Sequence, residues 1–301
     1  MNLRVALFAQ LLLCASRTAL AEPALPPSRS SIGSQIEALA HVGVATSPFD
    51  VRALPEAKGQ ALWFLASGRY ALSDPLAFEL HVPFVLGSVA QPAGSYIDTA
   101  ALGNPELAVR HRLWETQARE SLLALSGAIA VGAPLASHAE DLMPNRLLAV
   151  ADGLEGRGRP EWFTPGVFPV TASGALSWAS ESWNIEGELR LPLLVRVSEA
   201  DLPDGATNSN SFGLASVLGL RARYRLSRRL SLASAAHLFF DLVPAVEHVR
   251  AVSRVQDFEQ LSLHIHFGSL AALIVDLQTA IGGELGGSTV AGGLRALVTF
   301  R

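Results

Sequence analysis

Apolar and polar residues alternate along much of this chain with a period of two. The clearest segment runs from Trp183 to Val197, where the odd positions are apolar apart from Gly187. Its even positions include two acids, two arginines and an amide. A period of two is that of a β-strand, whose successive side chains point to opposite faces. The pattern therefore predicts strands with one apolar face and one charged face.

Twelve segments of this kind can be traced. We predict strands near residues 34–46, 60–72, 75–87, 104–114, 121–133, 166–180, 183–197, 212–226, 230–241, 257–267, 270–281 and 289–300. Each is long enough for a tilted membrane crossing, which takes about 9–11 residues.

The predicted connections alternate between short and long. The short ones lie at 73–74, 114–120, 180–182, 227–229 and 268–269, and the mostly long, polar ones near 47–59, 88–103, 134–163, 198–211, 242–256 and 282–288. Outer-membrane barrels have short periplasmic turns and long extracellular loops, so both ends of the predicted barrel lie on the periplasmic side.

Composition supports a membrane protein without membrane helices. Half of the residues are hydrophobic and the mean hydropathy is +0.31. The two longest uncharged stretches, 121–137 and 163–180, are interrupted by glycine and proline. In lipid, only a closed barrel satisfies the backbone of extended strands. We therefore predict an all-β fold: one closed antiparallel transmembrane β-barrel of about twelve strands, spanning residues 34–301.

The amino terminus indicates export. Arg4, an apolar run at 5–15 and the small-residue site Ala19-Leu20-Ala21 predict a secretory signal peptide, residues 1–21, that is cleaved after Ala21. Residues 22–33 form a Pro-rich periplasmic lead, far too short for a plug domain. Cleavage removes the only cysteine and changes the formal net charge from −4 to −6, because Arg4 and Arg17 are lost and no acid is. This balance argues against nucleic acid as a partner.

The charged faces of the strands predict a polar lumen. Its candidate constriction residues are Glu79, His81, Glu106, Arg110, Arg112, Glu186, Glu188, Arg190, Arg221, Arg223 and Arg225. These residues either select solutes or form an ordinary self-paired barrel interior. Packed arginines are costly unless they are paired, so Glu106, Glu186, Glu188 or solvent anions are expected to neutralise them.

Catalytic, cofactor and metal sites are not predicted. An outer-membrane hydrolase would need a lipid-facing Ser–His pair near the outer rim, and none is evident. His264 and His266 share one strand face at a spacing that can hold a metal, but no third ligand is evident. We therefore predict that the protein is not an enzyme.

Pro83 and Pro192 lie within predicted strands, on the inward face. Proline removes a hydrogen bond from the strand ladder and is normally excluded from paired strands. Either each proline forms a local bulge that curves the wall, or one strand bends inward and opens the wall sideways toward the lipid.

Aromatic residues gather near the predicted strand ends, as in the girdles of membrane barrels. They are Trp63, Phe64, Tyr70, Phe78, Trp114, Trp178, Trp183, Tyr224 and Phe300. The last strand alternates up to Phe300, which resembles the closing strand read by the barrel-assembly machinery, although Arg301 follows. Lipid, this machinery and a small solute are the expected partners.

Two neighbouring segments carry a family resemblance. Phe78-Glu79-Leu80-His81-Val82-Pro83-Phe84, followed by Leu102-Gly103-Asn104-Pro105-Glu106-Leu107-Ala108-Val109-Arg110-His111-Arg112-Leu113, resembles the outer-membrane transporter-like family named after the meta-pathway of phenol degradation. Asn104 and His111 stand where that family usually has Asp and Tyr. The resemblance implies a barrel that passively admits small hydrophobic or aromatic solutes. A structural or partner-binding barrel with a lumen blocked by salt bridges is the alternative.

The longest connection also contains a candidate helix at 145–153. This connection either folds into the barrel as a constriction or remains a solvated loop.

Overall fold

The computed structural model describes residues 34–45, 59–90, 95–118, 121–136, 142–154, 158–197, 206–244, 246–248, 255–281 and 289–300. The predicted signal peptide and Pro-rich lead lie outside these residues. No helix in the described part is long and apolar enough to cross a membrane.

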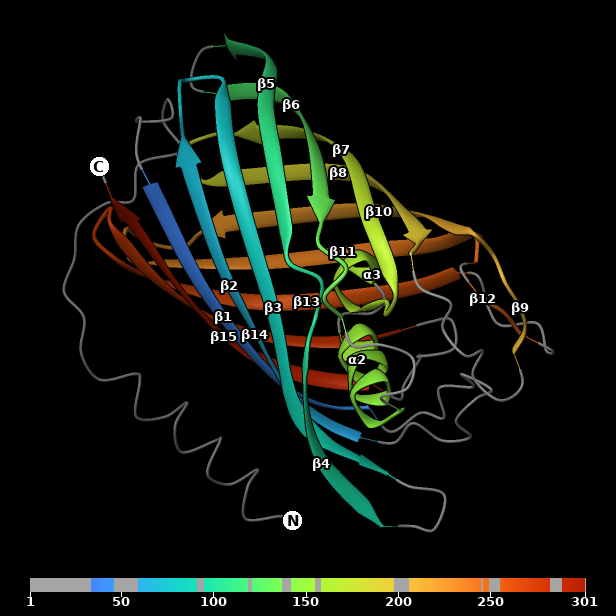
Figure 1. Ribbon diagram of the computed structural model, residues 1–301. Coiled ribbons are helices and arrows are strands. Elements are labelled where there is room, and N and C mark those ends of the chain that lie inside the picture. The colour runs from blue at the N-terminus through green and yellow to red at the C-terminus, as the bar shows by residue number, and fades with distance from the viewer. Residues whose placement is uncertain are drawn as a thin grey trace.

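Twelve strand positions close into an antiparallel barrel (Figure 1). Eleven of them are β1 Ser34–Ala45, β2 Gly59–Ala71, β3 Leu76–Ala90, β6 Ser121–Gly132, β7 Val167–Ala179, β8 Trp183–Arg196, β10 Phe212–Arg225, β11 Leu230–Val243, β13 Val255–Phe267, β14 Ala271–Ala280 and β15 Thr289–Phe300. The fourth position is shared by β4 Tyr96–Leu102 and β5 Glu106–Ala118, which both pair with β3. Pairing of β1 with β15 closes the ring, and the predicted barrel is confirmed.

The two rims of the barrel differ. One rim, called here the short-turn rim, carries the connections at 72–75, 119–120, 180–182, 226–229 and 268–270, and there Ser34 pairs with Phe300. The opposite, long-loop rim carries the remaining connections. Among them, β9 Ala206–Ser209 and β12 Val246–His248 form a small separate sheet.

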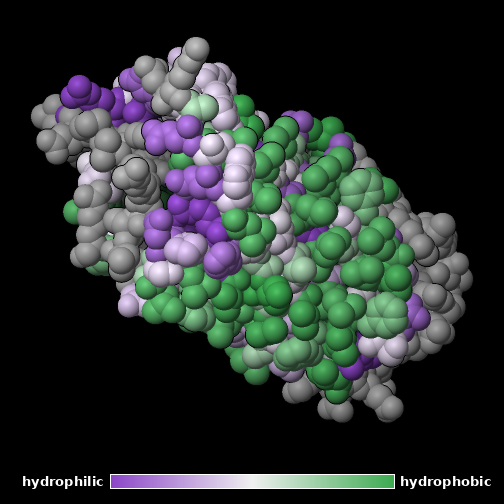
Figure 2. All heavy atoms as spheres, turned by 90° about the horizontal axis from the view of Figure 1, so that it is seen from above, coloured by the Kyte–Doolittle hydropathy of each residue, from purple (hydrophilic) through white to green (hydrophobic). Residues whose placement is uncertain are grey.

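The outer wall is apolar. Ile129 is 64% exposed, Leu113 61% and Leu220 59%. Figure 2 shows hydrophobic residues, in green, covering a broad continuous area of the surface. A patch of this extent is unfavourable in water and suits a lipid-facing wall.

Three local predictions were wrong. Residues 88–103 do not form a long loop, because β3 continues to Ala90 and β4 begins at Tyr96. The turn predicted at 114–120 is mostly strand, since β5 reaches Ala118 after a register shift between Arg112 and Trp114. Trp63 is fully buried on the inward face and takes no part in a girdle. In contrast, Tyr70, Trp114, Trp183 and Tyr224 are exposed close to the short-turn rim.

The longest connection folds against the inside of the barrel. It contains α2 Leu142–Leu154 and α3 Pro160–Phe163, and its described residues 142–154 and 158–163 are called here the inner segment. The predicted helix at 145–153 is confirmed as part of α2. α2 packs against β1 to β4 and β15, while α3 lies against β7 and β8. In Figure 1 the two helices occupy the space between β4 and β7.

The core of the molecule lies at this contact. It comprises Ala61, Trp63, Leu65, Val85, Val89, Ala101, Ala136, Leu147, Leu148, Val150, Ala151, Leu154, Trp162, Phe163 and Ala291. Three glycines permit the close approach of α2: Gly43, Gly59 and Gly87. A Cβ at Gly59 would lie 2.9 Å from Val150 Cγ2, and a Cβ at Gly87 would lie 2.7 Å from Leu147 Cδ1.

Candidate functional site

The fourth strand position is interrupted between β4 and β5, and Asn104 occupies the interruption. Its side chain is fully buried. Its Nδ2 donates to the carbonyl oxygens of Glu161 at 3.0 Å and Thr164 at 2.9 Å, and its Oδ1 accepts from Ala136 N at 2.9 Å. The backbone Asn104 N also donates to Trp162 O at 2.8 Å. An amide side chain can both donate and accept, so Asn104 ties the inner segment to the wall at this point.

A buried ion pair forms a second attachment. Glu161 has no exposed side-chain surface, and its Oε1 lies 2.7 Å from Arg190 Nη1 and 3.5 Å from Arg159 Nη1. Arg190 also donates to the Gly158 carbonyl oxygen, and its Nε lies 3.7 Å from Glu188. A third attachment is the donation from Gln278 Nε2 to Leu154 O at 2.8 Å.

Aromatic side chains pack where the inner segment meets the wall. The ring centroids of Trp63 and Phe163 are 5.8 Å apart in an edge-to-face arrangement, and those of His81 and Trp162 are 5.6 Å apart. The Arg159 guanidinium stacks on Trp162 at 4.6 Å from the ring centroid. Ser67 Oγ and His81 Nδ1 are 2.9 Å apart, within hydrogen-bond distance.

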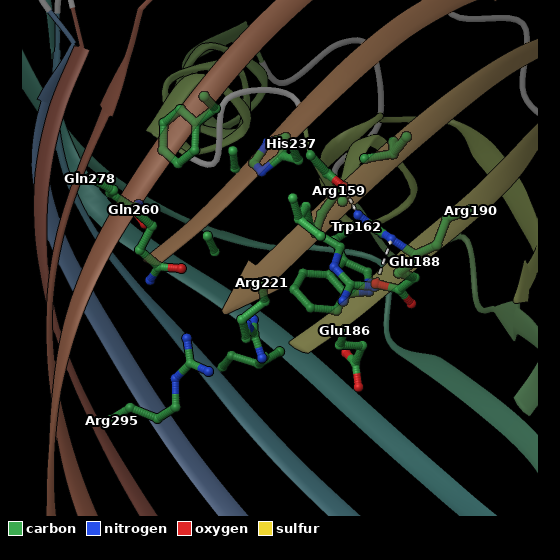
Figure 3. Close-up of a pocket in the computed structure, with 18 of the residues that line it drawn as sticks. Arg159, Trp162, Glu186, Glu188, Arg190, Arg221, His237, Gln260, Gln278 and Arg295 are labelled. Carbon is green, nitrogen blue, oxygen red and sulfur yellow. Dashed lines mark hydrogen bonds and ion pairs between the residues drawn. The ribbon is translucent and has the colours of Figure 1, made fainter. Parts of the chain in front are cut away.

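A cavity of about 290 Å³ remains between the inner segment and the opposite wall. The inner segment contributes Gly158, Arg159 and Trp162, and the wall contributes residues of β1, β2, β3, β8, β10, β11, β13, β14 and β15. Figure 3 shows Arg159, Trp162 and Arg190 on one side of this space, with Gln260, Gln278 and Arg295 on the other. Its lining therefore combines aromatic surface with several guanidinium groups.

The predicted lumen residues separate into groups along the barrel. His81, Glu186, Glu188, Arg190 and Arg221 line the cavity together. Glu106 is buried next to the interruption of the wall and forms no ion pair within 4.0 Å among the described residues.

Two further arginines pair outside the cavity. Arg110 Nε lies 2.9 Å from Glu79, which also lies 3.6 Å from Arg69. Arg112 pairs with Asp74 and Glu115 near the short-turn rim. These two arginines thus form ion pairs with Glu79, Asp74 and Glu115, which were not named as their partners from the sequence, and neutralisation by solvent anions stays a prediction.

The three arginines of β10 differ from the rest. Among the described residues, none of Arg221, Arg223 and Arg225 has a carboxylate oxygen within 4.0 Å, the limit for an ion pair. The β-register places Arg221 opposite Glu186 and Arg223 opposite Asn184 on β8. By contrast, Arg295 on β15 lies 3.2 Å from Glu37 and 3.8 Å from Asp276.

The two prolines occupy different surroundings. Pro83 lies beside the interruption of the fourth strand position, and its carbonyl oxygen accepts from Gly103 N at 3.0 Å. Pro192 pairs with Thr171 on β7, but Leu191 and Pro192 have no register partners on β10. The register between β8 and β10 is the same on both sides of this gap, and a bulge lies nearby between Leu214 and Ala215.

Several residues of the site were not predicted from the sequence: Glu37, Trp63, Arg159, Glu161, Trp162, Gln278 and Arg295. His264 and His266 stack at 6.3 Å between centroids. The described residues contain no cluster of three or more His, Cys, Asp or Glu side chains able to hold a metal ion.

The sequence matches no protein-family model and no curated protein. Solved structures share its fold. The COG4313 outer membrane channel from Pseudomonas putida F1 has a TM-score of 0.60 and 15% identity, over 94% of this chain and 100% of that one. The NanC porin has a TM-score of 0.51 and 7% identity, over 88% of this chain and 99% of that one. For the transport unit of the autotransporter AIDA-I from Escherichia coli the TM-score is 0.51 and the identity 9%, with coverage of 98% and 97%. These likenesses define the class by its fold, an outer-membrane β-barrel.

Proposed function

We propose that this protein is a passive outer-membrane channel for small hydrophobic or aromatic solutes. The observation that carries this proposal is the cavity of about 290 Å³ between the inner segment and the wall. An apolar cavity of about 150 Å³ holds benzene, so this one has room for a substituted single ring. Trp162, Trp63 and Phe258 supply apolar surface to it. The shared fold with an outer membrane channel supports the proposal.

The incomplete wall suggests how an apolar solute leaves. Among the described residues, β4 pairs with β3 on one side, and no strand pairs with its other edge. The next strand, β6, ends at Gly132. Beyond it, Val167–Pro169 of β7 pair only with β8. The inner segment covers this gap from the inside. Trp162 lines the cavity, and its carbonyl oxygen accepts a hydrogen bond from Asn104 N at the interruption between β4 and β5. Trp162 therefore connects the cavity to the interrupted wall.

We therefore place the sideways exit beside Pro83. Its carbonyl oxygen points toward Gly103, and in an antiparallel ladder the N–H and C=O of one residue point to the same neighbour. Proline lacks the N–H that would complete this pairing. Around Pro192, β8 pairs with β7 and also with β10 on both sides of the two-residue gap, so the wall there has no free strand edge and Pro192 is not part of the proposed exit.

A second candidate function is a blocked barrel with a structural or partner-binding role. The dense packing of α2 against β1 to β4 and the buried Glu161–Arg190 pair favour it. Single-channel recording in planar bilayers separates the two. Discrete current steps from purified, folded protein support the channel, and their absence supports the blocked barrel.

A further inference from the structure

Among the described residues, one cation in the cavity lining forms no ion pair, whereas its neighbours do. Arg159 and Arg190 engage Glu161, and Arg295 engages Glu37 and Asp276. Arg221, also in the cavity lining, has no carboxylate oxygen within 4.0 Å among the described residues. In Figure 3 its side chain extends from β10 into the space between Arg295 and Trp162.

Among the described residues, Glu186 and Glu188 on the neighbouring strand β8 form no ion pair with Arg221. Glu188 is 3.7 Å from Arg190, which also holds Glu161. Glu186 stands opposite Arg221 in the β-register, yet the two form no ion pair. Arg221 is exposed to the lumen, so its guanidinium is accessible to a solute.

The arginines of β10 continue toward the short-turn rim. Arg223 and Arg225 follow Arg221 at intervals of two residues, which places successive Cα atoms about 7 Å apart on the same face. Neither has an ion-pair partner among the described residues. The three form a row of cations from the cavity to the rim, and such a row attracts and guides anions.

The cavity lining also supplies aromatic surface. Trp162 and Phe258 line the cavity together with Arg221. A ligand that matches this lining has a negative charge, which accepts hydrogen bonds from the guanidinium, and a ring, which packs on the aromatic surface. We infer that the cavity binds small aromatic carboxylates, with Arg221 contacting the carboxylate. This inference rests on the proposed function and names its substrate class.

Calorimetric titration of the purified, detergent-solubilised barrel with benzoate tests the inference, with benzyl alcohol as the uncharged probe. The variant is Arg221→Gln. The matched control is Arg228→Gln, which makes the same charge change on the exposed turn between β10 and β11. Resistance of the folded barrel to unfolding in SDS gels shows that each variant has its native fold.

We expect benzoate to bind the unaltered protein and to bind Arg221→Gln at least about tenfold more weakly, since a hydrogen bond to a charged group contributes about 1.5–3 kcal/mol. Benzyl alcohol should bind both equally, and Arg228→Gln should retain benzoate affinity. The inference is overturned if the unaltered protein does not bind benzoate, or if Arg221→Gln binds benzoate as tightly as the unaltered protein does. Either result holds whether or not the protein conducts current. If benzoate binds and its binding depends on Arg221, but the protein carries no current in planar bilayers, the proposed channel function is overturned and the binding inference is not.

Discussion

Arg190 on the barrel wall and Glu161 on the inner segment are joined by a 2.7 Å contact between Nη1 and Oε1, although 29 residues separate them in the chain. Glu161 is fully buried and Arg190 nearly so. The pair fixes α3 against β8 and thereby sets one side of the cavity.

Loss of one partner of this pair should loosen the inner segment. Arg190→Gln leaves the buried Glu161 with only the more distant Arg159, and breaking a buried ion pair costs about 3–5 kcal/mol. We expect a lower urea midpoint and larger, noisier single-channel currents. The double variant Arg190→Gln/Glu161→Gln should recover part of the stability. Equal stability of the single variant and the unaltered protein would show that the pair does not anchor the segment.

The close approach of α2 gives a second prediction. Gly59→Val should displace Val150, because even a Cβ at this position would lie 2.9 Å from its Cγ2. Overpacking of this kind costs about 1–3 kcal/mol. The helix is pushed away from the wall into the lumen, so the bore should narrow and the single-channel conductance should fall. Gly68→Val on the same strand is the control, since nothing lies within 4 Å of a Cβ there. Identical conductance in the two variants would contradict the packing argument.

Asn104 provides a pH-dependent test. Asn104→Asp keeps the shape but directs a carboxylate at the carbonyl oxygens of Glu161 and Thr164, where the amide donated. We expect a destabilisation of about 1–3 kcal/mol at neutral pH. Protonation restores a donor, so the difference from the unaltered protein should shrink as the pH falls. Asn104→Ala should show no such recovery. Thermal unfolding at several pH values measures the difference, and a deficit in Asn104→Asp that is independent of pH would contradict the assignment.

The sideways exit predicts unequal effects of the two prolines. Pro83→Val adds an N–H directed at the interruption of the wall and should lower uptake of an apolar aromatic tracer into vesicles with a lipopolysaccharide outer leaflet. Pro192→Val should leave uptake unchanged, because the wall around Pro192 has no free strand edge. If both folded variants take up the tracer at the same rate, the proposed exit beside Pro83 is contradicted and the two prolines have only a structural role.

The strands could be predicted because each has one face toward lipid and one toward the lumen, so the sequence alternates. The inner segment could not be placed in this way. Its buried side chains meet β1 to β4 only in three dimensions, and the Glu161–Arg190 pair leaves no local pattern. The recognition of Phe300 by the assembly machinery stays a prediction.

One signal for the inner segment was nevertheless present. Ala61 to Leu65 and Val82 to Leu86 are apolar without interruption, whereas Ser67, Arg69, Glu79 and His81 restore the alternation nearer the short-turn rim. A continuous apolar run indicates a strand buried on both faces. In a lipid-facing barrel, such runs indicate where the lumen is filled, and α2 packs against these residues. This pattern also explains why Trp63 faces inward.

Osmotic swelling of proteoliposomes measures whether the cavity passes small single-ring solutes. Phenylalanine, a single-ring solute that crosses lipid slowly, is compared with the trisaccharide raffinose. We expect phenylalanine to swell the vesicles and raffinose not to. We also expect Gly59→Val to slow the swelling and Gly68→Val to leave it unchanged. Vesicles with folded, unaltered protein that swell no faster than protein-free vesicles in phenylalanine would contradict the proposed channel function.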